Sequence, residues 1–151
     1  MTYIGIDVGK NGGVAVIYGD GTLETHKCPA DSDGMAELMI DIKASAISEN
    51  DEIKCIIEHV HAFPNQGVVS MFNFGKNYGM WLGILSALGI DYMPISPRTW
   101  QPFYGKMPKN KIKRKNHLKQ LAQELYPHWK VTLAIADAIL LAVLLKSRIN
   151  E

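Results

Sequence analysis

Three acidic residues of this 151-residue chain stand in otherwise apolar segments: Asp7 in YIGIDVG, Glu58 in CIIEHV and Asp137 in LAIADAILLA. A carboxylate seldom lies in a buried segment unless it is paired or binds a metal ion. Three converging carboxylates would repel one another, and a divalent cation compensates such repulsion. Hard oxygen ligands without supporting Cys or His residues favour Mg²⁺ or Mn²⁺. The three acids are therefore candidate ligands of a catalytic metal.

Each acid also has a simpler interpretation. Asp7 could accept hydrogen bonds from backbone N–H groups of the glycine-rich turn that follows it. Glu58 could be an exposed strand end, and Asp137 could be an acid near the start of a helix. That all three simpler interpretations hold together is the less expected outcome, because such acids are rarely buried.

The elements that must position these acids follow from hydrophobic periodicity and from turn residues. Five strands are expected, at residues 3–7, 14–18, 22–28, 53–58 and 91–96. Four helices are expected, the first capped by Ser32 or Asp33, then 68–88, from about 111 to 126, and 132–145. Short turns make the first three strands an antiparallel meander. The pattern predicts one α/β domain over residues 1–151, a mixed five-stranded sheet with helices on its faces.

The charge of +1 hides a strong division along the chain. Residues 1–91 carry five basic and twelve acidic residues, a net of −7, whereas residues 92–151 carry eleven and three, a net of +8. Such asymmetry indicates a polyanionic partner bound by one face, with a merely solvated basic helix and loop as the alternative. The candidate phosphate contacts lie in the run GKMPKNKIKRKNHLK: Lys106, Lys109, Lys111, Lys113, Arg114 and Lys115.

The helix expected at 68–88 carries glycines at every fourth position. Gly75, Gly79 and Gly83 lie along one of its faces. Helical glycines cost about 1 kcal/mol each relative to alanine, so close packing is expected there. This face, with Met80 and Trp81 beside it, is a candidate dimer contact, and tight packing within one chain is the alternative. Cys28 and Cys55 are expected to be reduced and buried. No segment reaches the roughly 20 apolar residues of a membrane span.

Taken together, YIGIDVGKNGGVAVI, IIEHVHAFPNQGVVSMFNFGKNYGMWLGIL, ISPRTWQ and ADAILLA resemble the RuvC-like Holliday junction resolvases, in particular the short forms of bacteriophages and prophages. The resemblance covers nearly the whole chain in order. It implies a ribonuclease H-like fold, and a cytoplasmic, bacterial or phage-encoded protein. Asp7, Glu58 and Asp137 match the acids of the family's metal site.

The resemblance further implies a homodimer that makes paired nicks across four-way DNA junctions, with two Mg²⁺ ions per site for which Mn²⁺ can substitute. Two such ions would activate water and stabilise the leaving oxygen. An aromatic residue placed to stack at the junction centre corresponds to His61, with Phe63 two residues later. The alternative is that Phe63 packs into the core and that His61 is a surface residue. A zinc site formed by His59 and His61 is disfavoured, because nothing nearby completes a tetrahedral ligand set.

One position departs from the family pattern. A further acid, or a histidine, usually precedes the last aspartate by one turn, and here those positions are Leu133 and Ala134. A catalytically impaired junction-binding protein is therefore an alternative, as is an enzyme whose metal is completed by water, substrate or His128. A less selective ribonuclease H-like nuclease is a third possibility. The segment DVGKNGG also resembles the phosphate loop of actin-like ATPases and sugar kinases, which need two such domains.

Overall fold

The computed structural model describes residues 1–59 and 61–151, so Val60, in the loop expected after the fourth strand, lies outside the described residues. The strands are β1 (Thr2–Ile6), β2 (Gly13–Ile17), β3 (Leu23–Lys27), β4 (Ile53–Glu58) and β5 (Asp91–Ile95). The helices are α1 (Ser32–Ser48), α2 (Val68–Ala87), α3 (Pro97–Trp100), α4 (Lys111–Leu125) and α5 (Leu133–Ile149), with a 3₁₀ turn at Gln101–Tyr104.

The five strands form one sheet in the order β3-β2-β1-β4-β5. β1, β2 and β3 pair antiparallel, whereas β4 runs parallel to both β1 and β5. This confirms the mixed sheet with three antiparallel strands that the sequence predicts. In the parallel β1–β4 pair, Ile6 lies opposite Ile57, so the residues that follow them, Asp7 and Glu58, leave the same edge of the sheet side by side.

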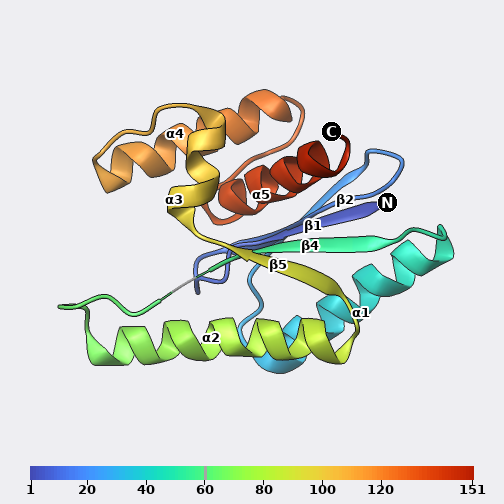
Figure 1. Ribbon diagram of the computed structural model, residues 1–151, viewed down its shortest axis with the longest axis horizontal. Coiled ribbons are helices and arrows are strands. Elements are labelled where there is room, and N and C mark those ends of the chain that lie inside the picture. Colours follow the sequence, from blue (N-terminus) through green and yellow to red (C-terminus); the bar gives the residue numbers. More distant parts are fainter. Residues whose placement is uncertain (60) are drawn as a thin grey trace.

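Helices cover both faces of the sheet, α1 and α2 on one side and α4 and α5 on the other (Figure 1). Side chains alternate between the faces of β1, as the strand period requires. Tyr3 belongs to the core beneath α4 and α5, while Ile4 and Ile6 belong to the core beneath α1 and α2. Each core is an apolar layer, which explains the near-continuous burial of β1 and β2.

Gly5 allows α5 to lie directly on β1. A Cβ atom at this position would stand 2.2 Å from the carbonyl oxygen of Ala138 and 2.6 Å from the amide nitrogen of Ala142. Gly13 on β2 is similar, with the Ala134 carbonyl oxygen at 2.7 Å. The backbone of α5 is thus nearly in van der Waals contact with two central strands, which brings the first turns of this helix to the strand ends.

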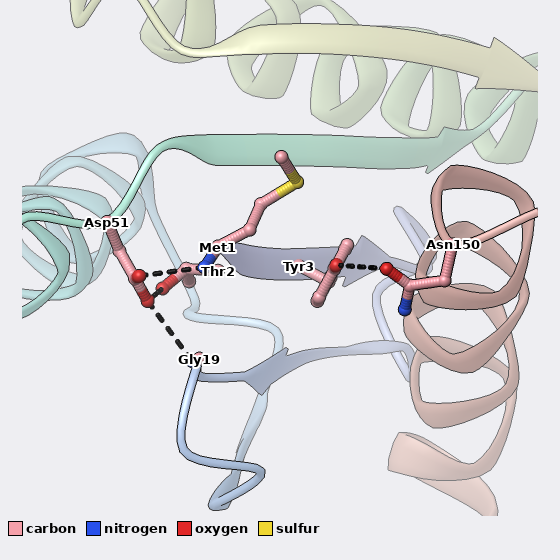
Figure 2. A network of polar contacts seen from close by, with 6 residues as sticks. All are labelled: Met1, Thr2, Tyr3, Gly19, Asp51 and Asn150. Carbon is pink, nitrogen blue, oxygen red and sulfur yellow. Dashed lines mark hydrogen bonds and ion pairs between the residues drawn. The ribbon is translucent and has the colours of Figure 1, made fainter.

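Asp51 fixes the opposite edge of the sheet. Its carboxylate accepts hydrogen bonds from the Met1 ammonium group at 2.7 Å, the Thr2 hydroxyl at 2.8 Å and the Gly19 amide at 3.1 Å (Figure 2). These bonds join the start of β1, the β2–β3 turn and the segment before β4. They also hold the pKa of Asp51 below its usual range.

Three details differ from the expectations. The N-cap of α1 is Asp31, whose side chain accepts a hydrogen bond from the Gly34 amide at 2.8 Å, rather than Ser32 or Asp33. The segment 97–104, expected to be loop, contains α3 and a 3₁₀ turn. Cys28 is only half-buried, although both cysteines are free as expected. None of the helices in the described ranges is long and apolar enough to cross a membrane.

The surroundings of the three α2 glycines contradict one of the two interpretations of their spacing, namely tight packing within one chain. A Cβ atom at Gly75, Gly79 or Gly83 would meet no atom within 4 Å, so tight packing within one chain is wrong. Trp81, expected beside a dimer contact, is instead completely buried in the core of its own chain. The glycines therefore lie on an open face of α2.

Candidate active site

Asp7 follows β1 directly and is 8% exposed. Its Oδ1 atom accepts a hydrogen bond from the Gly9 amide at 3.3 Å, and its own amide donates to the Gly13 carbonyl at 3.0 Å. The turn closes tightly around this residue, because a Cβ atom at Gly12 would lie 2.8 Å from the Asp7 carboxyl carbon. The backbone bond expected from the simpler interpretation is present, yet it leaves Oδ2 available for other partners.

Glu58 is the last residue of β4 and is 9% exposed, so an exposed strand end is wrong. The indole N–H of Trp100 donates to its Oε2 atom at 2.8 Å. Trp100 is completely buried and ends α3, the short helix that follows β5. Sequence reasoning missed this residue. The available signal was that a buried indole N–H needs an acceptor, and few acceptors lie in a core.

Asp137 lies in the second turn of α5 and is 2% exposed. The ammonium group of Lys115, on α4, donates to its Oδ2 atom at 2.5 Å. Its Oδ1 atom is buried without a hydrogen-bond partner. A buried carboxylate oxygen that lacks a donor is costly, so this atom requires a cation or a donor from outside the chain.

The three carboxylates influence one another electrostatically. Burial, followed by the charge of Asp137, raises the pKa of Asp7 to about 6. Burial, followed by the charges of Asp7 and Asp137, raises the pKa of Glu58 to about 8. Lys115 opposes both shifts, and despite its own partial burial these acids hold its pKa above the usual value. The cluster is therefore an electronegative site already partly neutralised by one lysine.

The chemistry of the donor set suits a divalent cation, whereas the present spacing of its side chains does not. Its oxygens are hard ligands of the kind that Mg²⁺ and Mn²⁺ prefer, and the unpartnered Oδ1 of Asp137 marks where positive charge is missing. Across the described residues, however, no three Asp, Glu, His or Cys side chains are close enough together to hold one ion as they stand. The residue at the missing fourth position, Ala134, adds no ligand, and His128 is exposed in the turn before α5.

A cleft of about 590 Å³ opens over Glu58 and Asp137. Of the predicted DNA contacts, His61, Phe63, Lys111, Arg114 and Lys115 line it. Lys106, Lys109 and Lys113 are exposed but are not among its lining residues. Sequence reasoning did not assign a role to Arg98 or Gln101, which also line the cleft and come from the segment after β5.

The aromatic residues of the cleft form a short stack. The rings of His59 and His61 are 5.1 Å apart, and those of His61 and Phe63 are 5.0 Å apart. Phe63 is 51% exposed, so the alternative that it packs into the core is wrong. The Nδ1 atoms of His59 and His61 lie 3.1 Å apart and hydrogen-bond to each other. This arrangement offers π faces at the rim of the cleft rather than a pair of metal ligands.

Comparison with known proteins bears on this architecture. No protein-family model matches the sequence, and no curated protein matches it. Among solved structures, RuvC of Thermus thermophilus is similar, with a TM-score of 0.59, 16% sequence identity and coverage of 99% of this chain and 97% of that one. The chain has the fold of RuvC.

A second similar structure is T. thermophilus RuvC in complex with Holliday junction substrate. Its TM-score is 0.62 at 13% identity, and the match covers 99% of this chain and 96% of that one. The comparisons confirm the RuvC-like, ribonuclease H-like fold that the sequence resemblance implied. The phage form stays a prediction.

Proposed function

We propose that this protein is a metal-dependent endonuclease that cuts branched DNA, in particular four-way junctions. The observation that carries the proposal is that three buried carboxylates, after β1, at the end of β4 and on α5, influence one another electrostatically, and that two of them, Glu58 and Asp137, line a cationic cleft. The shared fold supports the choice of substrate, because one RuvC structure holds a Holliday junction substrate.

In this proposal Asp7, Glu58 and Asp137 hold Mg²⁺, for which Mn²⁺ can substitute. The bound cation would supply an activated water and stabilise the charge that develops on a scissile phosphate. The protein positions its carboxylates beforehand: Trp100 orients Glu58, and the turn after β1 orients Asp7. Burial is the main cause of the raised pKa values of Asp7 and Glu58, and the repulsion between the carboxylates adds to it; a bound cation would relieve that repulsion.

The cleft would bind the DNA backbone through Lys111 and Arg114, with Arg98 as an additional contact. Such contacts to phosphates supply affinity and register but little sequence reading. Lys106, Lys109 and Lys113 would extend this surface beyond the cleft. His61 and Phe63 would stack on unpaired bases at the junction centre, each worth about 1–3 kcal/mol.

A homodimer would place two such sites for paired nicks. The first half of α2 supports this arrangement, because Val68, Val69 and Phe72 are 85%, 73% and 70% exposed. Gly75 and Gly79 continue this open face. Exposed apolar side chains beside residues that permit close backbone approach are typical of an interface between subunits.

The test is cleavage of a labelled four-way junction with Mg²⁺, with Mn²⁺ and with a chelator, beside a linear duplex of the same sequence. We expect symmetric nicks that require metal and disappear in Asp7→Asn. The matched control is Asp41→Asn, the same change at an exposed position on α1, which should cut like the wild type. Metal-independent cutting, or equal cutting of the linear duplex, would contradict the proposal.

A second candidate is a junction-binding protein without nuclease activity. Ala134 favours it, because this residue precedes Asp137 by one turn on the same helix face and provides no ligand. Tight junction binding without nicks under either metal would select this candidate. Preferential cutting of an RNA–DNA hybrid would instead select a less selective ribonuclease H-like nuclease.

A further inference from the structure

Lys115 is the one feature of the site that the proposed metal chemistry does not use. Its ammonium group lies 2.5 Å from Oδ2 of Asp137, although the lysine side chain itself is 41% exposed. Long lysine side chains at a surface usually extend into water, where ion pairs contribute little. Here the acceptor is a carboxylate that is 2% exposed, so Lys115 reaches inward from α4 to a buried charge.

The neighbourhood of Lys115 extends beyond Asp137. Its charge also lowers the pKa values of Asp7 and Glu58, so one ammonium group contacts Asp137 and acts electrostatically on the other two acids. Arg114, the adjacent residue, turns the other way and donates to the carbonyl oxygens of Pro108 and Lys109. Lys111 lines the same cleft and is exposed. Of the cations that line the described cleft, Lys115 is the one bonded to a catalytic carboxylate.

The charges set a limit on further cations. When all three carboxylates are ionised, as cation binding requires, the acids and Lys115 carry a net charge of −2, which one divalent cation neutralises. Two divalent cations would leave the site at +2 in a largely buried environment, which electrostatics disfavours. Without Lys115 the site would have a net charge of −3. Binding of a second divalent cation would then leave a smaller excess of positive charge and would cost less electrostatic free energy.

We propose that the Lys115 ammonium group takes the place of one of the two divalent ions that the sequence resemblance implies, so that the site binds a single ion per chain. Lys115 neutralises Oδ2 of Asp137, and the groups that would hold the single ion are Asp7, Glu58 and the unpartnered Oδ1 of Asp137. The inference rests on the proposed function, since it specifies the cations of that same site.

The experiment counts bound Mn²⁺ ions per chain, without DNA, by titration with free Mn²⁺ followed by electron paramagnetic resonance and by calorimetry. We expect the wild type to bind one ion with the spectrum of an isolated Mn²⁺. We expect Lys115→Met to bind two ions, with the altered spectrum of two coupled ions. The matched control is Lys119→Met, the same change one turn further along α4 at a residue that lines a different cavity. It should bind one ion.

A double variant, Asp7→Asn with Glu58→Gln, gives the number of Mn²⁺ ions bound elsewhere on the protein. This number is subtracted from each count. Two ions in the wild type, or one ion of unchanged affinity in Lys115→Met, would overturn the inference. Should Lys115→Met fail to fold, the wild-type count alone decides. No binding by the wild type would overturn the inference and the metal dependence together.

Different results would contradict the proposed nuclease function and the proposed role of Lys115. Junction cleavage by a wild type that holds two ions would remove the role of Lys115 and leave the nuclease. One bound ion without cleavage of any junction would remove the nuclease and leave the role of Lys115.

Discussion

Gly5→Ala tests whether close contact between β1 and α5 builds both the fold and the site. The added Cβ atom would lie 2.2 Å from the Ala138 carbonyl oxygen and 2.6 Å from the Ala142 amide nitrogen, and contacts under 3.0 Å are essentially never seen. The helix must therefore withdraw by roughly 1 Å. Overpacking a core costs typically about 1–3 kcal/mol, and a backbone obstacle cannot rotate aside, so we expect a loss of about 3 kcal/mol.

The same displacement should reach the site, because Asp137 precedes Ala138 on the helix. A shift of about 1 Å in a catalytic group can cost on the order of 100-fold in rate. We therefore expect Gly5→Ala to weaken both Mn²⁺ binding and junction cleavage, even under conditions where the variant is fully folded. A change in stability without a change in metal binding would mean that α5 adjusts without moving Asp137.

The assay is equilibrium unfolding in urea at one protein concentration, with Gly83→Ala as the control. Both changes are made in the Phe72→Glu background, so that a dimer contact through α2 does not contribute. Gly83 lies inside α2 with no atom within 4 Å of an added Cβ, so alanine there should stabilise the helix by up to about 1 kcal/mol. The two identical changes should have opposite signs. A Gly5→Ala protein within about 0.5 kcal/mol of its Phe72→Glu parent would refute the reasoning.

Three further predictions concern the site and the surface. Trp100→Phe removes the donor to Glu58, so the free energy of unfolding should fall by roughly 2 kcal/mol or more, and the pKa of Glu58, which NMR titration measures, should rise further. Because burial raises the pKa of Glu58 to about 8 and that of Asp7 to about 6, the metal-free folded state binds protons more tightly than the unfolded chain between about pH 5 and 8. Its stability to urea should therefore fall as the pH rises, by up to about 1.4 kcal/mol per pH unit for each proton, and a flat profile would contradict this. Phe72→Glu should convert a dimer to a monomer in light scattering, whereas Ile112→Glu, at a similarly exposed residue of α4, should not.

Much of the fold could be predicted because the sequence patterns that mark its strands, turns and helices involve residues close together in the chain. Alternation of side chains across β1, turn glycines before β2 and the apolar run of β4 each depend on neighbouring residues. The predicted helices and strands agree with the observed ones to within a few residues. The burial of Asp7, Glu58 and Asp137 was also predictable, since an acid inside an apolar element has few other places to lie.

The partners of these acids could not be predicted in the same way. Trp100 bonds to Glu58 across 42 positions of sequence, and Lys115 bonds to Asp137 across 22. Both contacts depend on how α3 and α4 pack after the sheet has formed. The six basic residues between positions 106 and 115 looked equivalent in the sequence. The orientation of α4 directs Lys115, rather than Lys113, toward the acids.

The ion pair and the missing fourth acid concern the same electrostatic balance. A site with a fourth carboxylate and no inward-facing lysine would have a charge of −4 in a buried setting and would depend on metal ions for its stability. Ala134 in place of an acid removes one negative charge, and Lys115 adds one positive charge. Together they reduce the charge of the site from −4 to −2. Burial, together with the remaining charge, still raises the pKa values of Asp7 and Glu58, and under the proposed function a divalent cation would offset that charge. Under the proposed function, the departure at Ala134 would thus reduce the positive charge that the site requires, and would not by itself prevent metal binding.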